Sequence, residues 1–291
     1  MMINYQISTF HLTIPALCYA LQLDKSYPAC RQPAVQTRRF TGKMTLLIMN
    51  ILMNFCKLII LTITLPFQLM EVLGLYRMYK RLFPLLAYNI TFSYNEKMHE
   101  NKRNLFRNLC KFCSTDSTLR LLEIGCGSGA NFKYYPYGCT VICTDPNPYF
   151  EKYLQMSMSA NNHLTYERFV VASGEDLTVV EDKSVDVVVC TLVLCSVNNV
   201  PRVLKEAQRI LKKGGAFYFL EHVVADPSSW TYFFQHVLQP MWYYLGDGCM
   251  VTNATWRDLE AAGFSEIQLI HIEAPRVTFM IKPHILGYAI K

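Results

Sequence analysis

Short apolar runs alternate with segments of helical spacing from residue 120 to the C-terminus. Strand-like runs occupy 120–124, 140–144, 166–171, 185–191, 215–221, 265–272 and 284–290, and helix-like segments fall between them at about 149–160, 200–211 and 253–262. The run 185–190 is almost wholly apolar, as a central parallel strand that is buried on both faces should be. This alternation predicts an α/β fold in which helices cover both faces of a parallel sheet.

A long apolar segment precedes this region. Between residues 44 and 75 the only charged side chains are Lys57 and Glu71, and a second apolar patch follows at 82–88. A membrane span takes about 20 apolar residues, so the first segment is long enough to cross a bilayer. We expect a membrane anchor, with two arrangements open: one spanning helix, or a hairpin or interfacial helix held in one leaflet. Basic residues flank both ends, so the charge distribution does not decide between them.

These patterns divide the chain into three parts. Residues 1–43 show no clear amphipathic period and are expected to form a poorly ordered extension, residues 44–92 form the hydrophobic anchor, and residues 93–291 form the globular domain. From 93 to 113, apolar residues recur at roughly helical spacing among polar ones, which predicts an amphipathic helix leading into that domain. We expect this helix to pack over the ligand pocket.

Composition and charge favour a membrane surface as a partner. Hydrophobic residues make up 52% of the chain and charged residues only 17%. Residues 1–120 contain 15 Lys and Arg against 5 Asp and Glu, whereas residues 121–291 contain 13 against 17. The basic half therefore also contains the apolar segment, which favours contact with anionic lipid head groups. Nucleic acid is not expected as a partner, because the globular half is mildly acidic.

The cysteines indicate a reducing compartment. The chain has 11 of them, and several, such as Cys126, Cys143 and Cys190, lie in or beside apolar runs. Cysteines in such places behave as small buried hydrophobic residues in a reducing environment. Cys110 and Cys113 have the spacing of a metal-binding pair but no second pair nearby, and no metal site is predicted.

A glycine-rich turn is the clearest chemical motif. The apolar run 121–124 leads directly into Gly125, Gly127 and Gly129, and Asp145 follows at the end of the next strand-like run. Glycines allow a tight turn and close approach of the backbone to a ligand. An acidic residue at the neighbouring strand end is placed to accept hydrogen bonds from ribose hydroxyls. Together these residues predict a site for a nucleoside cofactor; alternatively, Asp145 is a helix cap ahead of Pro146.

The ordered motifs resemble those of class I S-adenosylmethionine-dependent methyltransferases. They comprise the glycine turn, Asp145, the acidic turn 173–176, the strand 186–191 and the segment 211–215. The resemblance is closer to one group, the methyltransferase-like microsomal thiol S-methyltransferases, in the segments 131–136, 145–148, 166–171, 187–196, 221–223 and 283–285. It extends from about Met44 to Lys291, and it implies a Rossmann-like, doubly wound sheet of seven mostly parallel strands.

The resemblance implies a role for each cofactor-site residue. The three glycines would surround the methionyl and ribose parts of S-adenosylmethionine, and Glu123 would lie near the cofactor's ammonium, directly or through water. Asp145, followed by Pro146, would bind the ribose. The adenine would be contacted by Ser173, Gly174 or Glu175, and Ser173 stands where many relatives have Asp. Cys190, Thr191 and Leu192 would lie beneath the transferred methyl group.

Catalysis of methyl transfer to a thiol needs little more than positioning. A thiol with a pKa near 8.5 is already a few per cent thiolate at neutral pH, so no strong base is required. His222, Asp247 and Cys195 are the candidate catalytic residues. His222 and Asp247 can equally be hydrogen-bonded structural residues, and we interpret Cys195 as pocket lining rather than as a direct participant.

The resemblance implies a membrane-anchored enzyme that methylates thiols of small lipophilic or alkyl molecules. It further implies a location on the endoplasmic reticulum membrane and on lipid droplets, with the catalytic domain facing the cytosol. Alternative acceptors are a lipid hydroxyl, a quinone or RNA. A non-catalytic membrane scaffold is a separate alternative, which the intact glycines and Asp145 disfavour. Nothing in the sequence specifies an oligomeric state.

Overall fold

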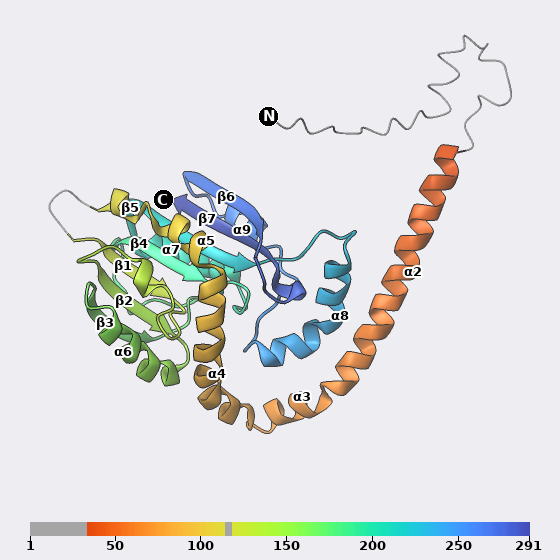
Figure 1. Cartoon of the computed structure of the whole chain (residues 1–291), viewed down its shortest axis with the longest axis horizontal. Helices are drawn as coiled ribbons and strands as arrows, with labels where there is room; N and C mark the ends of the chain where they lie inside the picture. The colour runs from red at the N-terminus through yellow and green to blue at the C-terminus, as the bar shows by residue number, and fades with distance from the viewer. Residues whose placement is uncertain (1–33, 114–117) are drawn as a thin grey trace, which may run out of the picture. The chain divides into compact units, whose positions relative to one another are not determined.

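The computed structural model of the protein describes residues 34–113 and 118–291 (Figure 1). The chain divides into two units, Met1–Asn54 and Phe55–Lys291. Most of the expected N-terminal extension therefore lies outside the described residues, and of residues 34–43 only the helical backbone is described.

A seven-stranded sheet forms the centre of the second unit. Its strands, in chain order, are β1 (Arg120–Ile124), β2 (Thr140–Asp145), β3 (Thr165–Val171), β4 (Val185–Thr191), β5 (Leu211–His222), β6 (Glu266–Glu273) and β7 (Pro283–Ile290). The spatial order is β3-β2-β1-β4-β5-β7-β6. The first five strands pair in parallel, and β7 runs antiparallel between β5 and β6. The predicted α/β fold with a mostly parallel seven-stranded sheet is confirmed.

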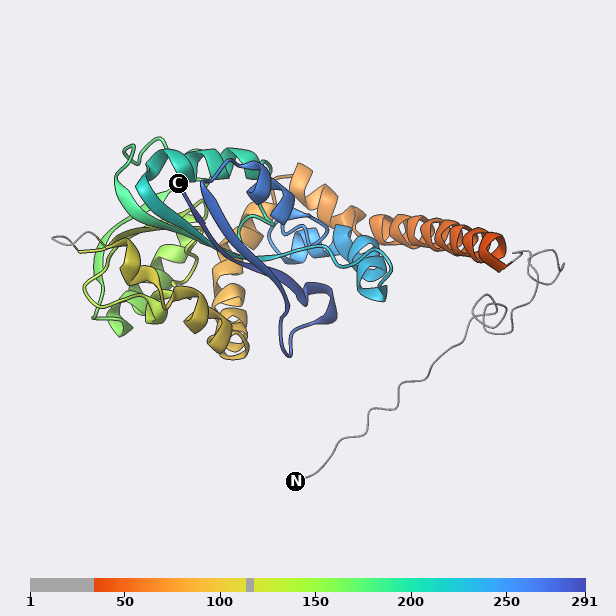
Figure 2. The same cartoon turned by 90° about the horizontal axis from the view of Figure 1, so that it is seen from above.

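Helices cover both faces of this sheet (Figure 2). The amphipathic helix α7 (Val200–Ile210) packs its apolar side against one face of the sheet. Helix α5 (His99–Phe106) and the end of α4 (Tyr76–Lys97) pack against the other face. β4 is buried at six of its seven positions, because both of its faces are covered. The remaining helices of the domain are α6 (Glu151–Ala160), α8 (Trp230–Leu245) and α9 (Thr255–Ala261).

The start of β5 differs from the sequence prediction. α7 ends at Ile210, close to the end expected at about residue 211, but the strand begins at once with Leu211 rather than at residue 215. The pairing of β5 with β4 then skips from Leu211 to Ala216. At the skipped position Gly215 packs so closely on β4 that a Cβ there would lie 2.7 Å from the carbonyl oxygen of Asp186. The glycines thus form an irregularity within the strand instead of preceding it.

Three helices occupy the region expected to form the anchor. They are α2 (Ala34–Ile63), α3 (Leu65–Val72) and α4 (Tyr76–Lys97). In the described part of the chain no single helix has both the length and the apolar character of a membrane span, but Leu47–Ile63 and Leu65–Val72, bent by 49° at their junction, have both when taken together. The expected border between anchor and globular domain, at 92/93, falls inside α4, and this division stays a prediction.

The single amphipathic helix expected over 93–113 is replaced by shorter elements. The end of α4 is followed by a bend at Met98, then α5 and a 3₁₀ turn, η2 (Leu109–Phe112). The apolar face was correctly recognised, because Met98, Leu105 and Leu109 are buried in the core. The periodicity did not reveal the bend, which places the side chain of Lys102 on α5 opposite that of Asn95 on α4.

Lys102 is the centre of a buried polar network that joins these helices to the sheet. Its side chain is 2% exposed, and its Nζ donates to Asn95 Oδ1 (2.6 Å) and Asn131 Oδ1 (2.8 Å). Asn131 in turn donates to Glu123 Oε1 (2.7 Å) on β1 and to Thr191 Oγ1 (2.9 Å) on β4. Burial lowers the pKa of Lys102 to about 7. One side chain therefore fastens α4 and α5 to two central strands.

Replacing Lys102 by Met should destabilise the protein by about 1–3 kcal/mol, because the amide oxygens of Asn95 and Asn131 lose their donor while remaining buried. Urea unfolding followed by circular dichroism measures the change. Lys111→Met, which alters an exposed lysine on η2, is the control and should be near neutral. Equal stability of the two variants would contradict the role assigned to Lys102.

Candidate active site

The glycine turn after β1 has a conformation that requires glycine. Gly125, Gly127 and Gly129 have φ values of 60°, 51° and 76°, a backbone region that residues other than glycine rarely adopt. At Gly125 there is also no room: an added Cβ would lie 2.4 Å from Val193 Cγ2. The turn therefore brings bare backbone against the loop that follows β4.

Asp145 completes the turn from the neighbouring strand. Its Oδ2 accepts from the Gly127 backbone N–H (3.1 Å), and its Oδ1 accepts from the Asn147 N–H (2.8 Å). The 3₁₀ helix η4 (Pro148–Phe150) is capped by Asn147, whose Oδ1 accepts from the Tyr149 N–H. The structure thus places Asp145 beside the glycine turn, while a different residue supplies the cap. Burial raises the pKa of the Asp145 carboxyl to about 6, against the lowering effect of the two backbone donors.

A cavity of about 330 Å³ lies at this edge of the sheet. Nine of the residues singled out from the sequence line it: Gly125, Gly127, Asp145, Pro146, Ser173, Gly174, Glu175, Leu192 and Asp247. They come from the carboxyl ends of β1, β2, β3 and β4 and from the loop after α8, segments far apart in the chain. Ligands of open α/β sheets bind at this position.

Several predicted residues lie behind the cavity wall. Glu123 is buried beneath the turn, where it accepts from Asn131 Nδ2 and from the Tyr135 hydroxyl at 2.7 Å each. Burial raises its pKa to about 7, although both hydrogen bonds act in the opposite direction. Gly129, Cys190 and Thr191 also lie outside the lining. Contact of Glu123 with the cofactor's ammonium stays a prediction.

Helix α4 supplies one wall that the sequence analysis did not find. Lys80 and Phe83 line the cavity from its first turns, in place of the segment 93–113 that was expected to cover the pocket. The backbone carbonyl of Lys80 accepts from Asn147 Nδ2 (2.9 Å), which fixes the helix to the β2 end. The basic cluster around Lys80 was visible in the sequence but was assigned to the anchor. Other lining residues that were missed are Ile124, Phe150, Val193, Ser196, Val197, Asn198 and Gly246.

Asp247 faces the cavity from the loop after α8. It has a positive φ of 48°, and its Oδ1 lies 3.5 Å from Lys80 Nζ and 3.4 Å from the Tyr76 hydroxyl, which donates to it. Burial, together with the charge of Asp247, raises the pKa of Tyr76, so this tyrosine remains a donor at neutral pH. Asp247 is the one of the three candidate catalytic residues that lines the cavity.

His222 and Cys195 lie elsewhere, and the structure brings them together with Cys249. Cys195 Sγ is 3.3 Å from Cys249 Sγ, which is 3.6 Å from His222 Nδ1. All three side chains are buried. Cys249 is not among the residues predicted from the sequence, where its only signal is its position two residues after Asp247.

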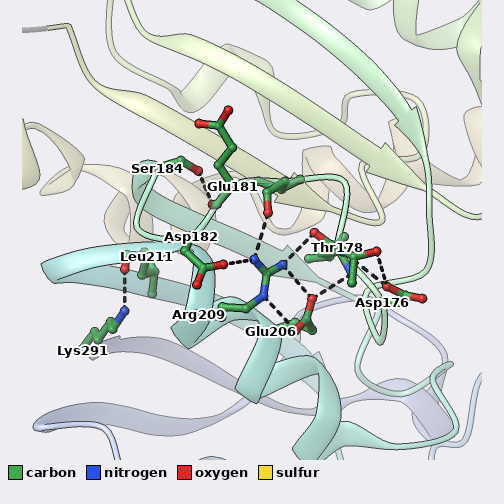
Figure 3. A network of polar contacts seen from close by, with 11 residues as sticks. Asp176, Thr178, Glu181, Asp182, Ser184, Glu206, Arg209, Leu211 and Lys291 are labelled. Atoms are coloured by element: carbon green, nitrogen blue, oxygen red, sulfur yellow. Dashed lines mark hydrogen bonds and ion pairs between the residues drawn. The ribbon is translucent and has the colours of Figure 1, made fainter.

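The acidic turn is held in place by an arginine on α7 (Figure 3). Arg209 donates to the Leu177 and Val180 carbonyls and pairs with Asp182 and Glu206. Glu206 also accepts from the Leu177 N–H. The loop between β3 and β4 is thereby fastened to α7, and its first residues, Ser173 to Glu175, line the cavity.

Comparison with known proteins identifies the family. Residues 122–219 match the profile of the family described as "Methyltransferase domain". The human thiol S-methyltransferase TMT1A is 55% identical over 212 residues, covering 73% of this chain and 87% of that protein. Human thiol S-methyltransferase TMT1B is 48% identical over 244 residues, covering 84% of this chain and all of that protein. The chain belongs to the thiol S-methyltransferase family.

A solved structure shows the same fold. It is an S-adenosylmethionine-dependent methyltransferase from Thermotoga maritima, with a TM-score of 0.50 and 17% identity, covering 74% of this chain and 99% of that one. The family lies within the class I methyltransferases, so the protein is an S-adenosylmethionine-dependent methyltransferase.

The cavity fits the cofactor that the family uses. Its volume lies within the range of small-molecule sites, and Gly125 and Gly127 line it with backbone that carries no side chain. A carboxylate has about four acceptor positions, and the two backbone donors occupy only two of those of Asp145. The others are available for the ribose hydroxyls.

Cofactor affinity should fall as the pH is lowered through about 6. Asp145 accepts hydroxyl hydrogen bonds best as a carboxylate, and protonation at its raised pKa removes that form. We expect binding to be about tenfold weaker at pH 5 than at pH 8, measured by isothermal titration calorimetry. Asp145→Asn should bind weakly with little pH dependence. A wild-type affinity that stays constant over this range would contradict the assignment.

Proposed function

We propose that the protein transfers the methyl group of S-adenosylmethionine to the thiol of a small lipophilic molecule at a membrane surface. The observation that carries the proposal is the sequence identity of 55% and 48% to two proteins named thiol S-methyltransferases. In this chain the glycine turn and Asp145 also line one cavity. S-adenosylmethionine supplies the methyl group when it is bound.

The residues at the strand ends hold the cofactor. Backbone at Gly125 and Gly127 surrounds its ribose and methionyl parts, Asp145 accepts from its ribose hydroxyls, and the turn from Ser173 to Glu175 bounds its adenine end. Positioning of this kind contributes most of the rate in an in-line displacement. Leu192, another predicted residue in the lining, has a positive φ of 58° and bounds the cavity after β4.

Other residues of the lining suit an apolar acceptor with a weakly acidic group. Phe83, Val193 and Val197 provide apolar surface, and Lys80 and Asp247 provide one cation and one carboxylate. A carboxylate in the cavity can accept the proton of a thiol, whereas His222 and Cys195 are buried outside the lining. Asp247 is therefore our candidate for the group that assists deprotonation.

The membrane assignment rests on exposed apolar side chains. Large apolar residues along α2, α3 and α4 are exposed, among them Phe55 (61%), Leu58 (62%) and Val72 (84%). Exposed apolar surface of this extent marks a membrane or protein interaction site. Together with the basic N-terminal half, it supports a membrane anchor. The endoplasmic reticulum membrane and lipid droplets, with the catalytic domain in the cytosol, are the location that the family resemblance implies for it.

A transfer assay with labelled S-adenosylmethionine tests the activity. The acceptors are a panel of alkyl thiols, phenols, amines, a quinol and RNA, each supplied with the purified full-length protein in detergent or vesicles. We expect the label in thioether products of the alkyl thiols. Label in the phenol, quinol or RNA products alone would contradict the proposal, as would an absence of transfer in protein that binds the cofactor.

Gly125→Ala should abolish most of this activity by weakening cofactor binding at least about tenfold, because strain at positive φ adds to the contact with Val193. Gly138→Ala is the matched control: its φ is 76°, but nothing lies within 4 Å of an added Cβ and it is outside the cavity lining. The control should lose stability without losing affinity. Similar affinities in both variants would argue against the role of the turn.

Acidic substitutions on the exposed apolar surface should release the protein from vesicles. We expect Phe55→Asp, Leu58→Asp and Val72→Asp combined to lower the partition into neutral phosphatidylcholine vesicles by more than about tenfold, because each carboxylate opposes transfer into hydrocarbon. Flotation measures it. The control combines Tyr137→Asp, Val179→Asp and Ile270→Asp, which are also exposed but lie in the globular domain. Equal flotation of the two triple variants would contradict the assignment of these helices.

A further inference from the structure

Three side chains of the types that bind metal ions, two cysteines and one histidine, meet beside the active-site cavity. Cys195 follows β4, His222 ends β5, and Cys249 follows α8. One ligand atom from each lies within 4.8 Å of the others, and the side chains are 1%, 7% and 5% exposed. Chain segments separated by 27 residues or more in sequence thus converge on one buried point.

The observed distances are within about half an ångström of those in a tetrahedral zinc site. With zinc–sulfur bonds of about 2.3 Å and zinc–nitrogen bonds of about 2.0 Å, sulfur–sulfur and sulfur–nitrogen separations come to about 3.8 and 3.5 Å. The observed separations are 3.3 Å between the two sulfurs and 3.6 Å between Cys249 Sγ and His222 Nδ1. A shift of about half an ångström in one thiol would open the triangle to the size of the ion.

The polar groups at this point are also incompletely satisfied. His222 Nε2 is buried and has no hydrogen-bond partner among the described residues. The nitrogen that faces Cys249 is Nδ1, which lies 3.6 Å from its Sγ, so an ion at this point would bind Nδ1 and would not satisfy Nε2. Two thiolates and one divalent cation sum to zero charge, so a zinc ion could be held here without leaving a net buried charge.

We propose that Cys195, His222 and Cys249 bind one zinc ion. Soft thiolate ligands with one imidazole favour zinc over the oxygen-preferring magnesium and calcium. Three protein ligands leave one coordination position for a water or another small ligand. The proposal assigns a site where the sequence analysis predicted none, and it does not depend on the identity of the methyl acceptor.

The position of the site gives the ion a consequence for the cavity. Cys195 adjoins Ser196, and Cys249 lies shortly after Gly246 and Asp247; these three neighbours line the cavity. The Met250 N–H also donates to the Cys195 carbonyl (2.7 Å), so the two loops are already in contact. A zinc ion would join both loops to the end of β5. It would therefore fix the position of Ser196 relative to Gly246 and Asp247 in the cavity wall.

Metal analysis of the full-length protein tests the proposal. Protein purified without chelators should contain about one zinc ion per chain, measured by inductively coupled plasma mass spectrometry. After removal by a chelator, added Co²⁺ should produce the absorption of a thiolate–cobalt complex in the wild-type protein. Wild-type protein that contains no stoichiometric zinc and gives no such absorption would overturn the proposal. An intact mass two hydrogens lower, which a Cys195–Cys249 disulfide would cause, would overturn it as well.

Variants locate the ion. Cys195→Ser, His222→Gln and Cys249→Ser should each reduce the zinc content at least about tenfold. Cys139→Ser, which alters a thiol that is equally buried (1% exposed) but outside the cluster, should keep one zinc per chain. Circular dichroism confirms that each variant is folded, and the cobalt spectrum of the wild type decides the question if the ligand variants are not. Unchanged zinc content in folded ligand variants would place the ion elsewhere and contradict the proposal.

Discussion

The buried amine of Lys102 is the interaction on which the site's geometry depends most. A lysine that is 2% exposed costs free energy unless hydrogen bonds replace its lost hydration, and here Asn95 and Asn131 do so. The same Asn131 holds Glu123, which lies directly before the glycine turn. Burial disfavours the charged forms of both Lys102 and Glu123 and shifts the pKa of each to about 7.

This network explains how an N-terminal helix becomes part of the active site. Its attachment at Asn95 fixes the C-terminal end of α4, and the bond between Asn147 and Lys80 fixes its beginning. Between these points Phe83 lies against the ring of Phe150, in an edge-on contact with centroids 6.1 Å apart. The cavity is therefore bounded on one side by the sheet and on another by a helix that follows the apolar segment. A lipophilic acceptor dissolved in a membrane would meet this wall first under the proposed function.

The opposite end of the cavity is stabilised in a different way. Arg209 binds two carbonyls and the Asp182 carboxylate of the loop that follows β3, and it also pairs with Glu206 on its own helix, as Figure 3 shows in part. Because the guanidinium group offers five donors in a fixed plane, one side chain can hold a loop that has no regular secondary structure. The two ends of the cavity thus depend on one buried lysine and one largely buried arginine, and neither side chain lines the cavity.

The sequence alone determined the sheet and the centre of the cofactor site. Alternation of apolar runs with helical segments identifies strands because burial on both faces excludes polar residues from positions such as 187–190. The turn at Gly125 and the acid at Asp145 were recognisable because positive φ and close backbone approach leave glycine as the residue that fits. These constraints are local, and each can be recognised from a few neighbouring residues in the sequence.

Only the tertiary structure decided which distant residues share a wall with that centre. Lys80 and Phe83 line the cavity because the chain bends at Met98, directly after α4, and Lys102 fastens α4 in place. No periodicity in the sequence reports such a bend. Cys195, His222 and Cys249 meet because three separate chain segments end at the same edge of the sheet. Contacts of this kind depend on how the elements pack against one another. The sequence pattern specifies that packing jointly, over the whole core, and not at any single position.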